Sequence, residues 1–391
     1  MEIEILKEQN SPCVIDFCGD AQLRDLMTFI DRYWKKGHIL SSHKRLMDWQ
    51  HYDARKRRYT FAIARDRASQ EVLGILGFIS TAQFDPDLEE RKTIWLAVWK
   101  VRDDVNIPGL GLALRSFITS EESPAALGTV GFGEKTAVLY SRFGYQSGTL
   151  RQSYIVNRKK KNFHLIAKFD GRYDSGTSAR HEKISLVMVD KNNFRSIAED
   201  FVYRPPLEEM PVKSLRYFYN RYLEHPVYHY DLYALRAQGK YTGLFVIRRA
   251  KHRGHFALRM VDFWGPEAAM SGLKETFQKL LAQYDAEYLD FFNYGISREI
   301  LAEAGFLEMD ENSGMVVPNY YEPFEQRNIP INFAVIDLLS SNKKVKSPIF
   351  DTDEAWRFNV GKEKVNKAGG PANFKIFRGD CDQDRPNSIP G

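Results

Sequence analysis

The chain has 391 residues, of which 43% are hydrophobic, so it is long enough for two domains that each bury a core. Its 56 basic and 51 acidic residues leave a net charge of only +5, which argues against a nucleic-acid partner. The polar start MEIEILKEQN and the lack of a long apolar run argue against a signal peptide and a membrane span. The three cysteines have no metal-ligand spacing, so we expect a cytoplasmic protein without a metal site.

The first half is predicted to alternate between helices and strands. The hydrophobic period and the turn residues place its elements, in chain order, at 19–35 and 42–52 (helices), 59–65, 72–80 and 93–101 (strands), 110 onward (helix), 129–132 (strand), 135–143 (helix) and 153–156 (strand). The expected order is therefore helix, helix, three strands, helix, strand, helix, strand.

A similar order is predicted in the second half. Its elements are expected at 212–223 (helix), 228–234, 244–249 and 255–264 (strands), 268–284 (helix), 288–292 (strand) and 297–304 (helix). The clearest similarity between the halves is that of Phe143-Gly144-Tyr145 to Ala304-Gly305-Phe306, since each follows a predicted helix of similar length. This repetition predicts an internal duplication.

One segment carries a recognisable chemical pattern. Residues 93–114 read TIWLAVWKVRDDVNIPGLGLAL, an apolar strand that passes through a loop into a helix beginning at Gly109-Leu110-Gly111. Glycines let backbone amides approach a phosphate, and a helix N-terminus adds unpaired N–H donors and a partial positive charge. A Gly-x-Gly pair alone is equally typical of a simple turn.

The spacing around these glycines resembles motif A of the GNAT superfamily of N-acetyltransferases. There a strand ends in valine, and the pattern Arg/Gln-x-x-Gly-x-Gly/Ala begins five residues later. Val101 ends the strand here, Asn106 stands at the Arg/Gln position, and Gly109 and Gly111 fall where that family has glycines. Asn106 and Pro108 depart from the commonest pattern.

A second resemblance lies further along the chain. In that superfamily the next strand leads to a helix with a tyrosine, followed by Gly-Phe or Gly-Tyr, and Tyr140 with Gly144-Tyr145 has this spacing. The resemblance covers residues 15–157 and implies that Tyr140 protonates the departing thiolate of acetyl-CoA or another acyl-CoA. The cofactor contacts that it implies are Trp99, Val101, Asn106, Gly109, Leu110, Gly111, Leu112, Ala113 and Tyr140.

The fold implied is α/β (α+β), with two GNAT-like domains, each a mixed, mostly antiparallel sheet flanked by helices. We expect a catalytic domain at 1–160, a degenerate domain at 181–340, and an extension at 341–391 that could fold back over the active site. The second half lacks a cofactor loop, because Gly265-Pro266 is not followed by another glycine at the right distance. We therefore expect acyl-CoA in the first domain alone.

The acceptor is expected near the first two helices. His38 could deprotonate an amine, and Trp34, Ser41 and Trp49 could bind a sugar, although each tryptophan is equally typical of a core. Asp85 could bind a cationic amine, although its segment reads as a turn. Residues 34–50 and the tail resemble proteins of bacterial surface-polysaccharide biosynthesis, which implies a small-molecule acceptor such as an amino sugar. The backbone N–H groups near Trp99–Val101 are the expected oxyanion donors.

Two alternatives stay open. Tandem GNAT-like domains also resemble peptidoglycan aminoacyltransferases, which use charged tRNA and need no intact pyrophosphate loop. The departures at Asn106 and Pro108 also suit a non-catalytic scaffold. The aspartates of DCDQDRP in the tail lack the glycine and glutamate of a calcium loop, so the tail is not expected to bind metal.

Overall fold

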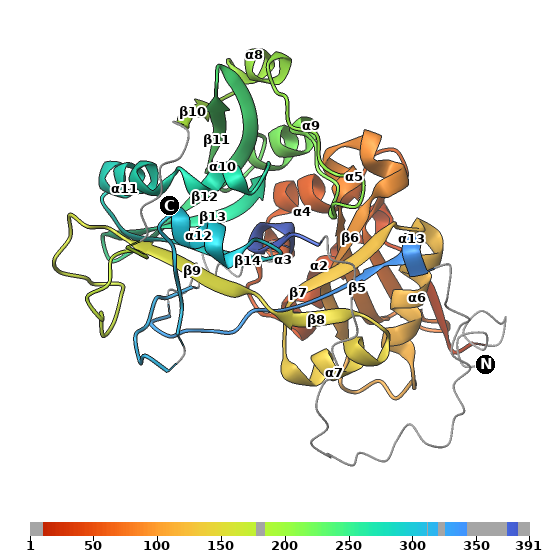
Figure 1. Cartoon of the computed structure of the whole chain (residues 1–391). Helices are drawn as coiled ribbons and strands as arrows, with labels where there is room; N and C mark the ends of the chain where they lie inside the picture. The colour runs from red at the N-terminus through yellow and green to blue at the C-terminus, as the bar shows by residue number, and fades with distance from the viewer. Residues whose placement is uncertain (1–10, 177–183, 311, 320–324, 342–373, 382–391) are drawn as a thin grey trace.

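The computed structural model describes residues 11–176, 184–310, 312–319, 325–341 and 374–381. The fold is mixed α/β, with two main sheets of mostly antiparallel strands and helices packed against them (Figure 1). No helix in these ranges is both long and apolar enough to cross a membrane.

The first sheet has seven strands in the order β1-β4-β5-β6-β7-β16-β8. Their bounds are β1 Cys13–Phe17, β4 Phe61–Asp66, β5 Val72–Ser80, β6 Thr93–Val101, β7 Ala126–Phe132, β8 Gln146–Thr149 and β16 Asn332–Asp337. The helical segments of this part are η1 Asp20–Gln22, α2 Leu23–Phe29, η2 Ile30–Trp34, α3 Ile39–Ser42, α4 Lys44–His51, α5 Thr81–Phe84, η3 Pro86–Arg91, α6 Leu110–Glu122, α7 Glu134–Arg142 and α13 Leu338–Ser341. A small hairpin joins β2 (Tyr52–Asp53) to β3 (Arg58–Tyr59).

The second sheet follows the order β10-β11-β12-β13-β14-β9-β15, with β17 paired to β14. Its strands are β9 Arg151–Val156, β10 Ser185–Val189, β11 Tyr230–Ala237, β12 Lys240–His252, β13 His255–Trp264, β14 Ala286–Tyr294, β15 Leu307–Glu308 and β17 Ile376–Phe377. The helical segments here are α8 Phe194–Glu199, α9 Leu215–Phe218, η4 Tyr219–Leu223, α10 Ala268–Ser271, α11 Lys274–Gln283, α12 Arg298–Glu303 and η5 Arg378–Cys381.

The two sheets repeat one pairing pattern. In each, three antiparallel pairings are followed by one parallel pairing, β6 with β7 and β13 with β14, and then by two antiparallel pairings. The sixth strand of each sheet comes from the other half of the chain. β9 joins the second sheet, where Figure 1 shows it in yellow beside the cyan strands, and β16 joins the first.

Because of this exchange, two strands pair with the sheet of the other half of the chain, which the sequence did not predict. A strand at 153–156 is confirmed, but β9 pairs with β14 rather than with the strands of residues 1–160. Likewise β16, from within 181–340, pairs with β7 and β8. The predicted order also lacked β1, which pairs with β4 at the edge of the first sheet.

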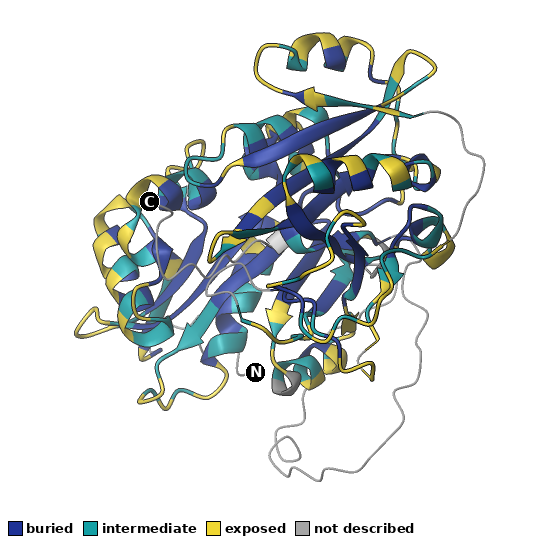
Figure 2. Cartoon of the chain, turned by 90° about the vertical axis from the view of Figure 1, so that its left-hand side faces the viewer, coloured by how far each residue is buried: buried dark blue, intermediate teal, exposed yellow. Residues whose placement is uncertain are grey.

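Alternate residues of the first sheet face two different helix layers. Ile94 and Leu96 pack with α6, while Trp95 and Ala97 pack with the layer of α2, α3 and α4. Figure 2 shows the strands mostly buried and the outer faces of the helices exposed. The expectation of a buried central strand at 93–101 is confirmed for its first six residues, and the last three are half-buried.

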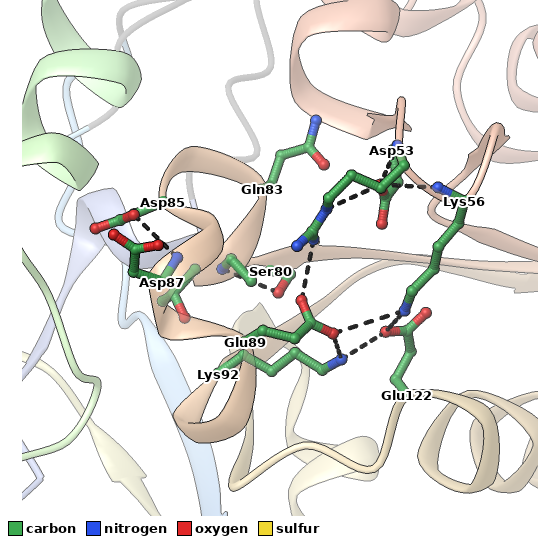
Figure 3. Close-up of polar contacts among 12 residues, drawn as sticks. Asp53, Lys56, Ser80, Gln83, Asp85, Asp87, Glu89, Lys92 and Glu122 are labelled. Atoms are coloured by element: carbon green, nitrogen blue, oxygen red, sulfur yellow. Dashed lines mark hydrogen bonds and ion pairs between the residues drawn. The ribbon is translucent and has the colours of Figure 1, made fainter.

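An ion cluster fixes the C-terminal end of α6 to the hairpin (Figure 3). The carboxylate of Glu122 lies 2.7 Å from Nζ of Lys56 and 2.9 Å from Nζ of Lys92. Lys92 also pairs with Glu89, which binds Arg55. Burial raises the pKa of Glu122, but the hydrogen bonds from Lys56 and Lys92 outweigh it and hold the pKa below its usual value. Glu122 therefore stays ionised and anchors the helix that begins at the glycine loop.

We expect Gly128→Ala to destabilise the first sheet. A Cβ at Gly128 would lie 2.4 Å from the buried ring of Trp95, so the free energy of unfolding should fall by about 1–3 kcal/mol. Gly133→Ala is the matched control, because a Cβ there meets nothing within 4 Å. Urea unfolding measures both variants, and equal losses of stability would contradict the packing described here.

Candidate functional site

Strand β6 leaves its parallel partner halfway along its length. The pairing with β7 runs from Thr93/Ala126 to Leu96/Thr129. Directly after it, the register with β5 shifts, since Gly77 faces Ala97 and Leu76 faces Trp99. Val98 is thus a bulged residue, and its φ of 41° is a rare conformation for a β-branched side chain.

Because of the bulge, Ala97 and Val98 lie on the same face of β6, and Trp99 lies on the opposite face. Ala97 and Val98 both pack with the layer of α2 to α4, whereas Trp99 packs with α6 and α7. Strained backbone persists only where its surroundings impose it, and it gathers at functional sites. The diverging ends of β6 and β7 are therefore the first candidate site.

The loop after β6 enters α6 through Gly109. This residue has φ 74°, in the left-handed region that favours glycine, and it is exposed. The N–H of Leu110 bonds to the carbonyl of Ile107, and that of Ala113 bonds to the carbonyl of Gly109. Within the described residues, the amides of Gly111 and Leu112 have no backbone acceptor, as expected for the first turn of a helix. These two N–H groups suit an anion.

Three of the residues predicted from the sequence lie together beside this turn. A Cβ on Gly111 would lie 3.2 Å from Nε1 of Trp99, so glycine allows α6 to approach the indole. The ring centroids of Trp99 and Tyr140 are 6.3 Å apart. Tyr140 is buried, and its ring also packs against Phe132 and Tyr145.

The charges in the loop nearly cancel. Lys100 pairs with Asp103 at 2.6 Å, and Arg102 pairs with Asp104 at 2.6 Å. Asn106 is exposed and Val101 is half-buried. An anion bound here would thus be held by backbone amides and the helix dipole rather than by an unopposed cation.

A central pocket lies on the other face of β6. Ala97 and Val98 line it, and its cavity is about 30 Å³, which is room for roughly two water molecules. The remaining lining residues come from α3, α4 and the second half: His38, Ile39, Leu40, Leu46, Trp49, Gln50, His51, Arg221, Tyr222, His225, Tyr228 and Tyr230.

Two pocket histidines are kept neutral. Burial lowers the pKa of His51 to about 3, and its Nδ1 lies 2.9 Å from the Thr60 hydroxyl. The pKa of His225 is also lowered to about 3, first by burial and then by the charges of Arg248 and Arg221. Since Nδ1 of His225 accepts the N–H of Tyr228 at 2.9 Å, its proton resides on Nε2.

His38 and Trp49, both expected at the acceptor site, line this pocket. Trp49 packs on His225, with ring centroids 4.3 Å apart. His38 is buried, and its Nδ1 accepts the N–H of Leu40 at 3.3 Å, which caps α3. A histidine in this hydrogen bond carries its proton on Nε2 when neutral, so Nδ1 serves as the helix cap, and the expected role of His38 as a base stays a prediction.

The other expected acceptor residues lie elsewhere. Ser41 bonds to the carbonyl of His38 at 2.6 Å and borders a shallow surface hollow beside α2. Trp34 is half-buried against the core and is not among the described residues that line the pocket. Asp85 is buried and caps η3 through the N–H of Asp87, as Figure 3 shows, and it also accepts from the Ser214 hydroxyl. Their roles in binding stay predictions.

The sequence did not single out Val98, Arg221 or His225. Tyr228 and Tyr230 are buried and also line the pocket. No local pattern joins Val98 to residues more than 120 positions later, so only the fold reveals the pocket.

Comparisons with known proteins give distant structural similarity. No family model and no curated protein matches the chain. A GCN5-related N-acetyltransferase from Anabaena variabilis aligns with 83% of this chain and 72% of its own, at 13% identity and a TM-score of 0.47. A conserved Enterococcus faecalis protein of unknown function, described as a probable N-acyltransferase, has the same coverages at 8% identity and a TM-score of 0.49.

A third similar structure is the Saccharomyces cerevisiae N-myristoyltransferase with bound myristoyl-CoA and inhibitors. It aligns with 84% of this chain and 81% of its own, at 10% identity and a TM-score of 0.43. Similarity at this level carries no functional argument, so the function proposed below rests on the residues of this chain.

We expect the chain to lose stability in mild acid because of His51. Its pKa is about 3 when folded and near 6.5 when unfolded, so the unfolded state binds more protons between these values. The free energy of unfolding should thus fall as pH drops below 6.5, by about 2 kcal/mol at pH 5 from this residue. Urea unfolding at pH 7 and pH 5 measures the loss. The loss should be smaller in His51→Gln, and an equal loss would contradict the assignment.

Proposed function

We propose that the chain is an acyl-CoA-dependent N-acyltransferase that moves an acetyl or other short acyl group to an amine. The observation that carries this proposal is the bulge at Val98, which places a glycine-entered helix on one face of β6 and a pocket on the other. A ligand that enters between the ends of β6 and β7 would meet both.

The residues present suit the cofactor. The amides of Gly111 and Leu112 would hold a phosphate group, and Gly109 provides the left-handed backbone that frees them. Trp99 would border the arm that leads from the phosphates to the pocket, and Leu110 and Ala113 support the turn from the core. When bound, acyl-CoA supplies an activated thioester.

Tyr140 is the proposed proton donor to the leaving thiolate. It lies beside Trp99, buried among aromatic rings, and a phenol in a partly desolvated site can give its proton to a thiolate. The amides after the bulge, near Trp99–Val101, are the proposed oxyanion donors. An amino sugar, free or linked to a nucleotide, stays the proposed acceptor. Because the central pocket holds roughly two water molecules, only the reacting end of a sugar would enter it unless the wall moves.

The second sheet supports confining the cofactor to the first half. Strand β13 has an equivalent bulge at Val261, since Val246 faces Asp262 and Ile247 faces Met260. There the ends of β13 and β14 are occupied by the chain itself, because β17 pairs with Asn293 and Tyr294. The shared pairing pattern also supports the proposed duplication.

Binding of acetyl-CoA tests the cofactor site. Acetyl-CoA should raise the melting temperature of the chain, and Gly109→Asp should weaken its affinity at least about tenfold against Gly109→Asn. The two variants match because both side chains tolerate a positive φ, and a Cβ at Gly109 meets nothing within 4 Å. Equal binding by both variants, or no binding by the natural chain, would refute the proposal. A shift with charged tRNA instead would favour an aminoacyltransferase.

Tyr140→Phe tests the proton donor. The ring packing is kept, so the affinity for acetyl-CoA should be unchanged while kcat with an amine acceptor falls by about 10²-fold. A panel of amino sugars and simple amines, followed by release of free thiol, gives the rate. An unchanged kcat would remove Tyr140 from the chemistry.

A further inference from the structure

The hairpin of β12 and β13 carries positive charge at its tip. Arg253 and Gly254 have φ values of 48° and 87°, as in the tight two-residue turn that joins antiparallel strands. The two strands stay paired up to this turn. Arg249, Lys251 and Arg253 are all exposed, so the tip presents three cations on a well-defined backbone.

A second basic segment lies beside the tip. The loop after β9, yellow in Figure 1, contains residues 158–161 and lies on the same side of the molecule as α11. The ring of His164 in this loop stacks on His255 at the start of β13, with centroids 3.8 Å apart. Two segments far apart in the sequence thus form one basic surface. Its five exposed cations are Lys159, Lys161, Arg249, Lys251 and Arg253.

The carboxylates near this basic surface bind other groups. Arg158 binds two of them, at 2.7 and 2.9 Å, and Lys160 binds a third at 2.7 Å. The fourth is buried and accepts two backbone N–H groups of the loop, at 2.8 Å each. Within the described ranges, none of the five cations of the basic surface forms an ion pair with a carboxylate. In this order the four carboxylates are Asp174, Glu275, Asp285 and Glu287.

The other basic run of the sequence, residues 55–58, has no such excess of charge. Arg55 lies 3.0 Å from Glu89, and Lys56 lies 2.7 Å from Glu122. By contrast, the five cations of the basic surface equal the net charge of +5 of the whole chain. The excess positive charge of the protein is therefore concentrated at the tip of the second sheet rather than spread evenly.

The aromatic rings at the basic surface are covered by the cations. The guanidinium carbon of Arg249 lies 5.3 Å from the ring centroid of Phe256 and 6.0 Å from that of Tyr284. Nζ of Lys251 lies 5.7 Å from the centroid of Phe256. Binding of unpaired nucleic-acid bases uses exposed ring faces. A projecting tip that presents dispersed cations instead suits a flat, negatively charged surface.

We propose that the basic surface binds a lipid bilayer through its anionic headgroups. A lysine or arginine close to such a bilayer strengthens binding by about fivefold. The five cations together should then give a preference on the order of 10³-fold over a neutral bilayer. The attraction is between exposed charges, so salt should weaken it. This inference is independent of acyl-CoA binding and goes beyond the proposed function.

Sedimentation of the full-length chain with lipid vesicles tests the proposal. Vesicles of phosphatidylcholine with about 30% phosphatidylserine should bind the chain at about 0.1 M salt and release it at about 0.5 M. Vesicles of phosphatidylcholine alone are the neutral control and should not bind. Equal binding to both kinds of vesicle, or binding to neither, would overturn the proposal.

Two pairs of substitutions locate the binding surface. Lys251→Gln with Arg253→Gln removes two charges from the hairpin tip, and the affinity for the anionic vesicles should fall by about 30-fold. Lys159→Gln with Lys161→Gln removes two charges from the neighbouring loop and should have the same effect. This second pair also serves if the hairpin variant does not fold.

The matched control removes the same charge elsewhere. Arg45→Gln with Arg57→Gln changes two exposed cations of the first half, so the affinity for the anionic vesicles should stay close to that of the natural chain. An equal loss in this control would show that only the net charge matters and would overturn the proposal. Binding of transfer RNA that both basic-surface variants weaken, without binding to vesicles, would overturn it in favour of a nucleic acid.

Discussion

The parallel pairing of β6 with β7 ends at Leu96 and Thr129, and the candidate site depends on that end. A residue is inserted at Val98, so the alternation of side chains across β6 changes its phase there. Ala97 and Val98 face the central pocket, whereas Trp99 faces α6 and Tyr140. A β-branched residue with positive φ is costly, by about 1–3 kcal/mol, and the buried layers on both sides of β6 hold it.

The second sheet has a bulge at the equivalent place, but there another strand of the chain covers the ends of the parallel strands. Its bulge at Val261 lies against Gly379, and β17 adds to the end of β14. The C-terminal segment 374–381 therefore completes the second sheet from within the chain, and the bond from Arg221 to Gly379 also supports the pocket that opens on the first.

Local patterns predicted much of the fold. The bounds of β5, β6 and β13 were predicted to the residue, because each is a long, mainly apolar run between turn residues. The turn at Gly109 was likewise visible, because positive φ strongly favours glycine. The strand β1 was missed, since Cys13–Phe17 is short and carries no clear alternation.

The strand exchange and the central pocket could not be predicted from local patterns, because both depend on contacts between residues far apart in the sequence. The exchange of β9 and β16 between the sheets has no local signal, since both strands lie where either sheet could take them. Arg221 and His225 likewise join His38 and Trp49 only after both halves fold together. Asp85 caps η3 through the N–H of Asp87 and accepts a hydrogen bond from Ser214, and its expected role at the acceptor stays a prediction.

Hydrogen exchange of the full-length chain with and without acetyl-CoA tests the central claim most directly. Slower exchange at residues 97–101 and at the amides of Gly111 and Leu112, with no change at residues 261–272 beside the second bulge, is the result expected from a single cofactor site at the end of β6. Unchanged exchange at Gly111 and Leu112, or equal protection beside both bulges, would contradict it.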